Sequence, residues 1–254
     1  MNLKAIGRLT LEALKTYFRV EFEGVENIPT TGRTILAPNH SGFVGADALI
    51  ITSVVKRETK RRARILAHRA YFDLSEKLGA LSRSFGLKRA TVEDGVKTLE
   101  QDQLLLLFPE GEAGNFKSTL KKYQLQKFKT GFLRMAIETG SPIVPTLVLG
   151  AEESNLNLGN VDFTGLLKNV RVPLPINLIP LPAKWKIIFL PAIQPENFSK
   201  DLLENPKALR AEAAKIQKRM QKALNQSRKG RKYIYSKKTR ELIESHYNIH
   251  PDLG

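Results

Sequence analysis

The chain lacks several residues and patterns that define common protein classes. Its 254 residues include no cysteine, which excludes disulfide bonds, thiolate metal sites and a cysteine nucleophile. No stretch approaches the roughly twenty uninterrupted apolar residues that a bilayer-spanning helix needs. The N-terminus lacks the short basic region and apolar core of a signal peptide. We therefore expect a chain that neither spans a bilayer nor carries an export signal.

Motifs for common cofactors are also missing. The sequence contains neither a glycine-rich phosphate loop ending in Lys-Ser or Lys-Thr nor the glycine triplet of a dinucleotide site. Apart from one glycine-flanked histidine, the histidines are scattered, and His68, His246 and His250 have no metal-ligand spacing. We expect these three to be structural or exposed, and we expect no bound metal and no bound cofactor.

Positive charge is what the chain has in excess. Lysine and arginine number 41 against 25 acidic residues, which gives a formal net charge of +16. Such a balance implies an anionic partner, which could be nucleic acid, an anionic membrane surface or a phosphorylated substrate. The charge by itself does not choose among them.

The first residues predict an amphipathic helix over residues 1–18, followed by one domain at 19–227 and a basic tail at 228–254. Such a helix can lie in the lipid interface or dock on its own domain. We expect the tail, which contains Arg228, Lys229 and Arg231, to be only partly ordered. The polar side of the helix is expected to carry Lys4, Arg8, Glu12, Lys15 and Arg19, and the apolar side Leu3, Ile6, Leu9, Ala13, Leu14 and Tyr17.

Apolar strands alternate with helices through the central part of the chain. Apolar runs at 34–37, 65–67, 104–108 and 143–149 are typical of strands in a sheet that is covered on both faces. This alternation predicts a single α/β domain with a mainly parallel central sheet flanked by helices. The expected helices lie at 48–55, 74–81, 91–101 and 128–139 and from Asn205-Pro206 onward, and further expected strands lie at 19–24 and 186–190.

A proline-rich apolar segment lies beyond residue 150. Its prolines, at positions 173, 175, 180 and 182, each remove a backbone donor and restrict the preceding residue. We therefore expect a loop rather than a helix or a central strand. Beside Trp185, such a loop could contact lipid, close over an acyl chain or simply pack against the domain.

His40 is the main candidate for a catalytic group. It follows an apolar strand within the segment Ala37-Pro38-Asn39-His40-Ser41-Gly42, and Asp47 lies downstream. Glycines nearby would let a substrate approach closely, and Asp47 could hold one imidazole nitrogen while the other acts as a base. Alternatively, His40 is a hydrogen-bonded histidine in a turn and Asp47 only caps a helix that starts at Ala48.

A second charged turn follows the strand at 104–108. It reads Pro109-Glu110-Gly111-Glu112, and open α/β sheets place ligand sites at the carboxyl ends of their strands. A serine or cysteine nucleophile with its own base is not apparent in the sequence. A neutral imidazole, in contrast, suits direct proton abstraction near pH 7.

Three short motifs, taken in their order along the chain, resemble those of a known family. Asn39-His40 with Asp47, then Phe108-Pro109-Glu110-Gly111, then Ile143-Val144-Pro145 resemble glycerolipid acyltransferases of the 1-acylglycerol-3-phosphate O-acyltransferase type. The resemblance covers about residues 20–195. With the segment at 123–128 and the Leu-Pro-rich loop, it is most similar to bacterial and plastid-type lysophospholipid acyltransferases, and it implies a glycerol-3-phosphate acyltransferase-like α/β fold.

The resemblance implies direct acyl transfer without a covalent acyl-enzyme. His40 would be the general base and Asp47 would orient it. The donor would be an acyl thioester on coenzyme A (acyl-CoA) or on acyl carrier protein (acyl-ACP), used as a co-substrate. The acceptor would be the hydroxyl of a lysophospholipid such as 1-acylglycerol-3-phosphate.

The same resemblance implies roles for the residues that bind substrate. Glu110 and Gly111 would shape the acceptor site, and Arg89 would bind a phosphate. Positive charge at Arg89 and along 117–129 would complement coenzyme A phosphates or a head group, and the third block would support the thioester pocket. The implied substrate-binding residues are Arg89, Phe108, Pro109, Glu110, Gly111, Lys117, Val144 and Pro145.

The sequence departs from the family pattern twice. Six residues, 41–46, separate His40 from Asp47, which is longer than the usual spacing, so the loop must bulge if the two side chains are to meet. Ala113 stands where the family has an arginine that is thought to grip an acceptor phosphate. A neutral lipid alcohol, such as diacylglycerol or a long-chain alcohol, is therefore an alternative acceptor.

With the resemblance, the N-terminal helix and the net charge are best explained together. We expect a peripheral enzyme on an anionic membrane surface at the cytoplasmic face. Its partners would be a lipid acceptor, an acyl thioester and, if the donor is acyl-ACP, acyl carrier protein, with no nucleic acid. A basic nucleic-acid-binding protein and an inactive lipid-binding member of the family are the non-enzyme alternatives, and the former leaves the histidine and Phe-Pro-Glu-Gly motifs unexplained.

Overall fold

The computed structural model describes residues 3–40, 45–68, 70–73, 82, 86–115, 117–163, 170–175, 177, 179–229, 231, 234–237, 241 and 245. The helix that the sequence predicts at 74–81 lies outside these residues, as do His246 and His250.

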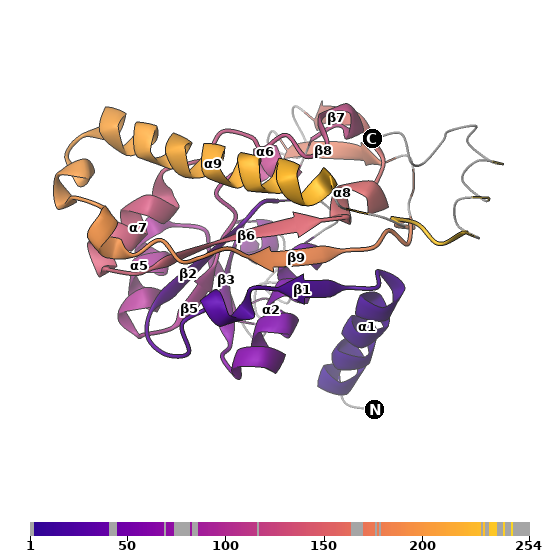
Figure 1. Cartoon of the computed structure of the whole chain (residues 1–254), viewed down its shortest axis with the longest axis horizontal. Coiled ribbons are helices and arrows are strands. Elements are labelled where there is room, and N and C mark those ends of the chain that lie inside the picture. The colour runs from indigo at the N-terminus through magenta and orange to yellow at the C-terminus, as the bar shows by residue number, and fades with distance from the viewer. Residues whose placement is uncertain are drawn as a thin grey trace.

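A seven-stranded sheet organises the fold (Figure 1). Its strands are β1 (Glu21–Glu23), β2 (Thr34–Pro38), β3 (Ala63–Ala67), β4 (Leu87–Arg89), β5 (Leu104–Leu106), β6 (Ile143–Leu149) and β9 (Lys186–Phe189). They lie in the order β1-β9-β6-β2-β5-β3-β4. Neighbours are parallel except β6 and β9, which are antiparallel. The predicted mainly parallel sheet is thus confirmed.

Helices cover both faces of the sheet. The described α-helices are α1 (Leu3–Tyr17), α2 (Ala46–Thr59), α3 (Ala70–Asp73), α5 (Val92–Glu100), α6 (Glu112–Asn115), α7 (Gly131–Thr139), α8 (Ala151–Ser154) and α9 (Pro206–Lys229). Short 3-10 turns are η1 (Val25–Asn27), η2 (Thr119–Lys121), η3 (Pro195–Asn197) and η4 (Lys200–Leu203). Helices α5, α7 and α9 pack on one face, and α1 and α2 pack on the other.

The central strands alternate their side chains between two apolar cores. In β2, Ile35 and Ala37 lie in the core under α5, α7 and α9, whereas Leu36 lies in the core under α1 and α2. In β5, Leu105 lies in the core under α5, α7 and α9, and Leu104 lies in the core under α1 and α2. Because both faces are buried, these strands are apolar throughout, and each fully buried aliphatic side chain contributes about 1.5–3 kcal/mol to folding.

Local signals in the sequence set the helix ends. The Thr91 side chain accepts a hydrogen bond from the Asp94 N–H and begins α5, and Gly140, in the left-handed conformation at φ 62°, ends α7. The apolar stripe predicted for the last helix is buried as expected. Its residues are Leu209, Ala213, Ile216, Met220 and Leu224.

The proline-rich segment contains a strand that the sequence did not predict. Residues Val170–Pro175 form β8, which pairs antiparallel with β7 (Asn157–Phe163) in a separate two-stranded sheet. The expectation of a loop there was therefore wrong for residues 170–175. Both strands of such a ribbon are edge strands, so Pro173 and Pro175 are tolerated despite their missing N–H groups.

Helix α1 is present, but the predicted division of its faces was wrong in part. Leu11 and Leu14 pack against the core with the buried Phe18. The buried Lys15 bonds Ser53 Oγ at 3.3 Å rather than lying on the polar face. Leu9 and Tyr17, in contrast, are exposed. Among the described helices, none combines the length and the apolar character required to cross a bilayer.

Candidate active site

Strands β2 and β5 bring the two charged turns together. They are parallel neighbours with Leu36 opposite Leu106, so both chains leave the sheet at the same edge. His40 follows β2 and Glu110 follows β5. Carboxyl ends of adjacent parallel strands are the usual location of a ligand site in this architecture.

His40 and Asp47 form a hydrogen-bonded pair despite their long spacing. His40 Nδ1 lies 2.8 Å from Asp47 Oδ2, and the Asp47 side chain is 0% exposed. Asp47 lies in the first turn of α2, whose N-cap is Gly45 at φ 79°. The helix thus begins earlier than the predicted Ala48, and Asp47 is not its N-cap, although Oδ1 accepts from the Ala48 N–H at 2.8 Å.

This contact decides which imidazole nitrogen is available for chemistry. An ionised carboxylate only accepts hydrogen bonds, so Nδ1 carries the proton that it donates to Asp47. Nε2 then holds the lone pair, and no described residue bonds it. The His40 side chain is 14% exposed and stacks on Phe108 with ring centroids 3.8 Å apart. The ring is therefore held in place at Nδ1, and a small part of the side chain is exposed.

Glu110 fixes His40 through a hydrogen bond to its backbone N–H. Oε1 accepts from the His40 N–H at 2.9 Å, and Oε2 accepts from the Gln126 N–H at 2.6 Å. The side chain is 0% exposed, so these bonds replace hydration that the carboxylate has lost. Glu110 supports the histidine from within, and its implied part in shaping the acceptor site stays a prediction.

Gly111 and Gly114 permit the close packing around this turn. Gly111 has φ 58°, and a Cβ on it would meet Cε and Nζ of Lys129 at 2.9 Å. A Cβ on Gly114 would approach the Cβ atoms of His40 and Glu110 to 2.8 Å. The turn after Pro109 therefore requires glycine where it passes the histidine.

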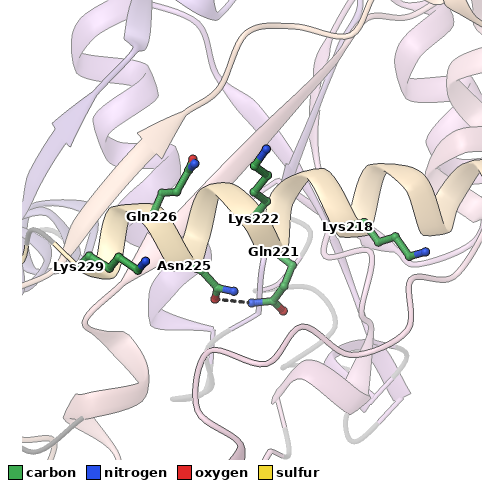
Figure 2. Close-up of a pocket in the computed structure, with 6 residues that line it drawn as sticks. All are labelled: Lys218, Gln221, Lys222, Asn225, Gln226 and Lys229. Atoms are coloured by element: carbon green, nitrogen blue, oxygen red, sulfur yellow. Dashed lines mark hydrogen bonds between the residues drawn. The ribbon is translucent and has the colours of Figure 1, made fainter.

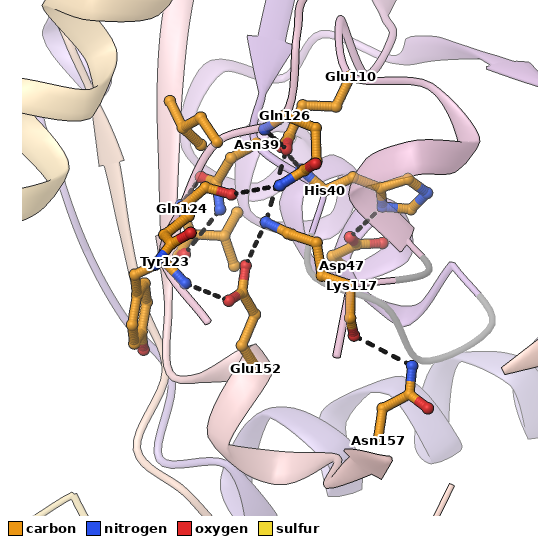
Figure 3. Close-up of polar contacts among 12 residues, drawn as sticks. Asn39, His40, Asp47, Glu110, Lys117, Tyr123, Gln124, Gln126, Glu152 and Asn157 are labelled. Carbon is orange, nitrogen blue, oxygen red and sulfur yellow. Dashed lines mark hydrogen bonds and ion pairs between the residues drawn. The ribbon is translucent and has the colours of Figure 1, made fainter. Parts of the chain in front are cut away.

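Lys117 is an internal cation rather than an open phosphate-binding group. Its side chain is 5% exposed, and Nζ lies 2.7 Å from Glu152 Oε1 and 3.5 Å from Glu110 Oε2 (Figure 3). Two carboxylates thus balance its charge inside the protein. The resemblance implied that positive charge along 117–129 complements coenzyme A phosphates or a head group, and Lys117 instead lies inside the protein.

Three further predicted site residues, Arg89, Val144 and Pro145, lie within strands of the sheet. Arg89 ends β4 at the sheet edge and pairs with Asp73 at 2.7 and 3.2 Å, and its hydrogen bond to Asp73 raises the pKa of Arg89. Val144 and Pro145 lie in buried β6 opposite Leu36 and Ala37 of β2. Their position beside β2 suits support of the strand that carries His40.

Residues 19–149 match the model of the family described as Acyltransferase. The chain belongs to the Acyltransferase family. The match extends from β1 to the end of β6 and includes both His40 and Glu110.

Two relatives and one solved structure are similar to this chain. An uncharacterized protein of Mycobacterium tuberculosis is 32% identical over 87% of this chain and 65% of its own length, and one of Mycobacterium leprae is 31% identical over 87% and 63%. The chain thus spans somewhat less than two thirds of these relatives. The 1-acyl-sn-glycerophosphate acyltransferase PlsC of Thermotoga maritima is 18% identical, with a TM-score of 0.57 over 93% of this chain and 85% of that one. This likeness shows the fold.

Asn39, which precedes His40 in the motif, holds the strand that leads to the histidine. It is 0% exposed. Its Oδ1 accepts from the Val148 N–H at 2.7 Å, and its Nδ2 donates to the Val148 carbonyl at 3.1 Å. This side chain therefore ties the end of β2 to β6, one residue before His40.

Two further features of the described residues bear on ligands. A groove of about 410 Å³ runs along α9, lined by Lys218, Gln221, Lys222, Asn225, Gln226 and Lys229 (Figure 2). None of these residues belongs to the His40 site. The described residues also contain no group of three or more histidines and carboxylates that could hold a metal ion, and His68 instead pairs with Glu112 at 2.6 Å.

Proposed function

We propose that this protein is an O-acyltransferase that moves a fatty acyl group from acyl-CoA or acyl-ACP to the hydroxyl of a lysophospholipid such as 1-acylglycerol-3-phosphate. The observation that carries the proposal is the 2.8 Å contact between His40 Nδ1 and the fully buried Asp47. Membership of the Acyltransferase family supports it independently.

The reaction follows from the tautomer that Asp47 selects. His40 Nε2 takes the proton of the acceptor hydroxyl while its oxygen attacks the thioester carbonyl carbon. Collapse of the tetrahedral intermediate breaks the carbon–sulfur bond, and the imidazolium returns its proton to the leaving thiolate. Asp47 stabilises the imidazolium between these two steps. The ester and the free thiol are the products, and no bound cofactor takes part.

The acceptor has a second candidate, a neutral lipid alcohol. Ala113 occupies the position of the family's phosphate-gripping arginine, and Lys117 is paired with Glu110 and Glu152. Arg89 is likewise paired with Asp73. Because carboxylates already neutralise these two cations, the site would bind a phosphate monoester less well. This favours an uncharged acceptor such as diacylglycerol.

We further propose peripheral attachment to an anionic membrane at the cytoplasmic face. Leu9 and Tyr17 of α1 are 59% and 41% exposed, and Ile179 is 77% exposed. The Tyr17 hydroxyl donates to the Pro180 carbonyl at 2.7 Å, so the helix and the proline-rich segment offer apolar side chains next to each other. The net charge of +16 would add attraction to anionic lipids.

Thiol release from long-chain acyl-CoA and acyl-ACP tests the proposal. Purified protein is assayed in liposomes with lysophosphatidic acid, other lysophospholipids, diacylglycerol and long-chain alcohols. We expect acceptor-dependent release that His40→Ala lowers by about 10²–10⁴-fold, the usual contribution of a general base. The productive acceptor would name the substrate class. Release that is absent with every acceptor, or unchanged in His40→Ala, would refute the proposal.

A further inference from the structure

The basic tail places one arginine inside the protein. Arg231 Nη1 donates to the two Glu153 carboxylate oxygens at 2.8 and 2.9 Å and to the Tyr123 hydroxyl at 2.7 Å, and Nη2 donates to the Lys184 carbonyl at 2.9 Å. The side chains of Arg231 and Glu153 are 10% and 9% exposed. A pair buried to this degree is costly to break, because the remaining partner keeps an uncompensated charge.

Tyr123 links this pair to a second glutamate. Its hydroxyl donates to Glu153 Oε2 at 2.5 Å and accepts from the Gly150 N–H at 2.7 Å. Burial, and then the charge of Glu153, raises the pKa of Tyr123 well above its usual value, so the hydroxyl keeps its proton as a donor. Its backbone N–H donates to Glu152 Oε2. Tyr123 is thus bonded to two adjacent glutamates, one through its side chain and one through its backbone.

Glu152 extends the connection to the histidine. Its carboxylate pairs with Lys117, whose ammonium also faces Glu110, and Glu110 accepts from the His40 N–H. Burial raises the pKa of Glu152, and Lys117 opposes this rise. Figure 3 shows the part of this series that runs from Tyr123 to His40. Buried polar contacts therefore continue without a gap from Arg231 to the backbone of His40.

We propose that Arg231 is a positioning residue for His40. It holds Glu153 and Tyr123, which fix the pair of Glu152 and Lys117 and thereby the carboxylate of Glu110. The inference rests on the proposed acyl transfer and gives one residue of the basic tail an internal role. The guanidinium of Arg228, centred 4.5 Å from the Tyr123 ring centroid, packs on the same tyrosine.

A positioning role and a purely structural role differ in what they change. Loss of a structural contact lowers the melting temperature but leaves turnover intact well below it. Loss of a positioning contact shifts the base relative to the acceptor hydroxyl, and displacements of this kind reduce turnover strongly. The Nδ1 proton shared by His40 and Asp47 is a direct probe of that position by NMR.

The test compares Arg231→Met, Arg231→Lys and the control Arg219→Met, which removes the same guanidinium from an exposed position of α9. Turnover, acceptor KM and the His40–Asp47 proton signal are measured well below each melting temperature. We expect Arg231→Met to lower kcat about tenfold with KM little changed and to shift the proton signal. Arg231→Lys should keep part of the turnover and part of the signal, and Arg219→Met should match the wild type.

Two outcomes overturn the inference. The first is wild-type kcat together with an unchanged proton signal in Arg231→Met, even with a lower melting temperature. If Arg231→Met does not fold, the second outcome decides. It is a wild-type kcat together with a wild-type proton signal in Arg231→Lys. If the wild type transfers acyl groups to no acceptor, the proposed function fails, and the proton signal alone then decides the positioning role.

Discussion

Two pairs of buried carboxylates at the same end of the sheet have different partners. After β2 and β5, Asp47 bonds the ring of His40 and Glu110 bonds its backbone. After β6, Glu152 and Glu153 bond the cations of Lys117 and Arg231. A carboxylate that faces a titratable ring prepares a base, whereas one that faces a backbone N–H or a cationic side chain holds the surroundings in place. Asp47 should therefore control turnover most strongly, and the other three carboxylates should affect stability and the position of His40.

Replacing Asp47 by asparagine should separate chemistry from stability most sharply. The amide keeps the size of the carboxylate but cannot stabilise an imidazolium, and it no longer enforces the tautomer with a free Nε2. We expect kcat to fall about 10³-fold with a small change in melting temperature. Steady-state kinetics and thermal unfolding of Asp47→Asn check this, and near-normal turnover would assign Asp47 to the helix terminus alone.

Replacing Glu110 by glutamine should lower both turnover and stability. One amide oxygen can still accept from His40, but the amide nitrogen would face the Gln126 N–H, which leaves buried donors opposed. We expect about 1–3 kcal/mol lower unfolding free energy, the cost of an unsatisfied buried group, and about tenfold lower kcat. Urea unfolding and kinetics measure the two effects. Full activity in a destabilised protein would exclude control of His40 by this carboxylate.

Replacing Tyr235 by phenylalanine removes a contact of Glu153 and should change stability only slightly. The Tyr235 hydroxyl donates to the Glu153 carbonyl at 2.6 Å, and burial raises its pKa above the ordinary 10.0. The native state therefore retains a proton that the unfolded state loses above pH 10, so stability falls as pH rises there.

The variant should lose this part of the alkaline dependence. Above pH 10, the unfolding free energy of the variant should fall less steeply than that of the wild type. We expect the two slopes to differ by about 1.4 kcal/mol per pH unit, and we expect activity at neutral pH to be retained. Chemical unfolding at several alkaline pH values measures the slope. Identical slopes for wild type and variant would show that another group is responsible.

The sequence predicted the features whose signals are local. Apolar runs located the central strands, and the stripe from Leu209 to Leu224 located the last helix, because burial on both faces or on one stripe imposes a repeat that can be read directly. The candidates His40, Asp47 and Glu110 came from short motifs at strand ends. Their proximity followed from the parallel order of β2 and β5.

Features that depend on distant partners could not be predicted in this way. Asn39 bonds Val148, and Arg231 bonds Glu153, across long stretches of chain. One signal was available, since Glu152 and Glu153 lie shortly after the apolar run of β6, at the edge where His40 and Glu110 also leave the sheet. The internal use of Lys117 and Lys15 had no local signal, because a lysine in the sequence looks alike in solvent and in a buried ion pair.

Arg19 connects the beginning and the end of the described chain. Its Nη2 donates to the carbonyls of Pro182 at 3.0 Å and Ile234 at 2.6 Å, and nearby β1 pairs with β9. The sheet edge therefore cannot close during synthesis until β9, residues Lys186–Phe189, has left the ribosome. Contacts of such large sequence separation slow folding, so the N-terminal segment must wait, unpaired, for the last strand.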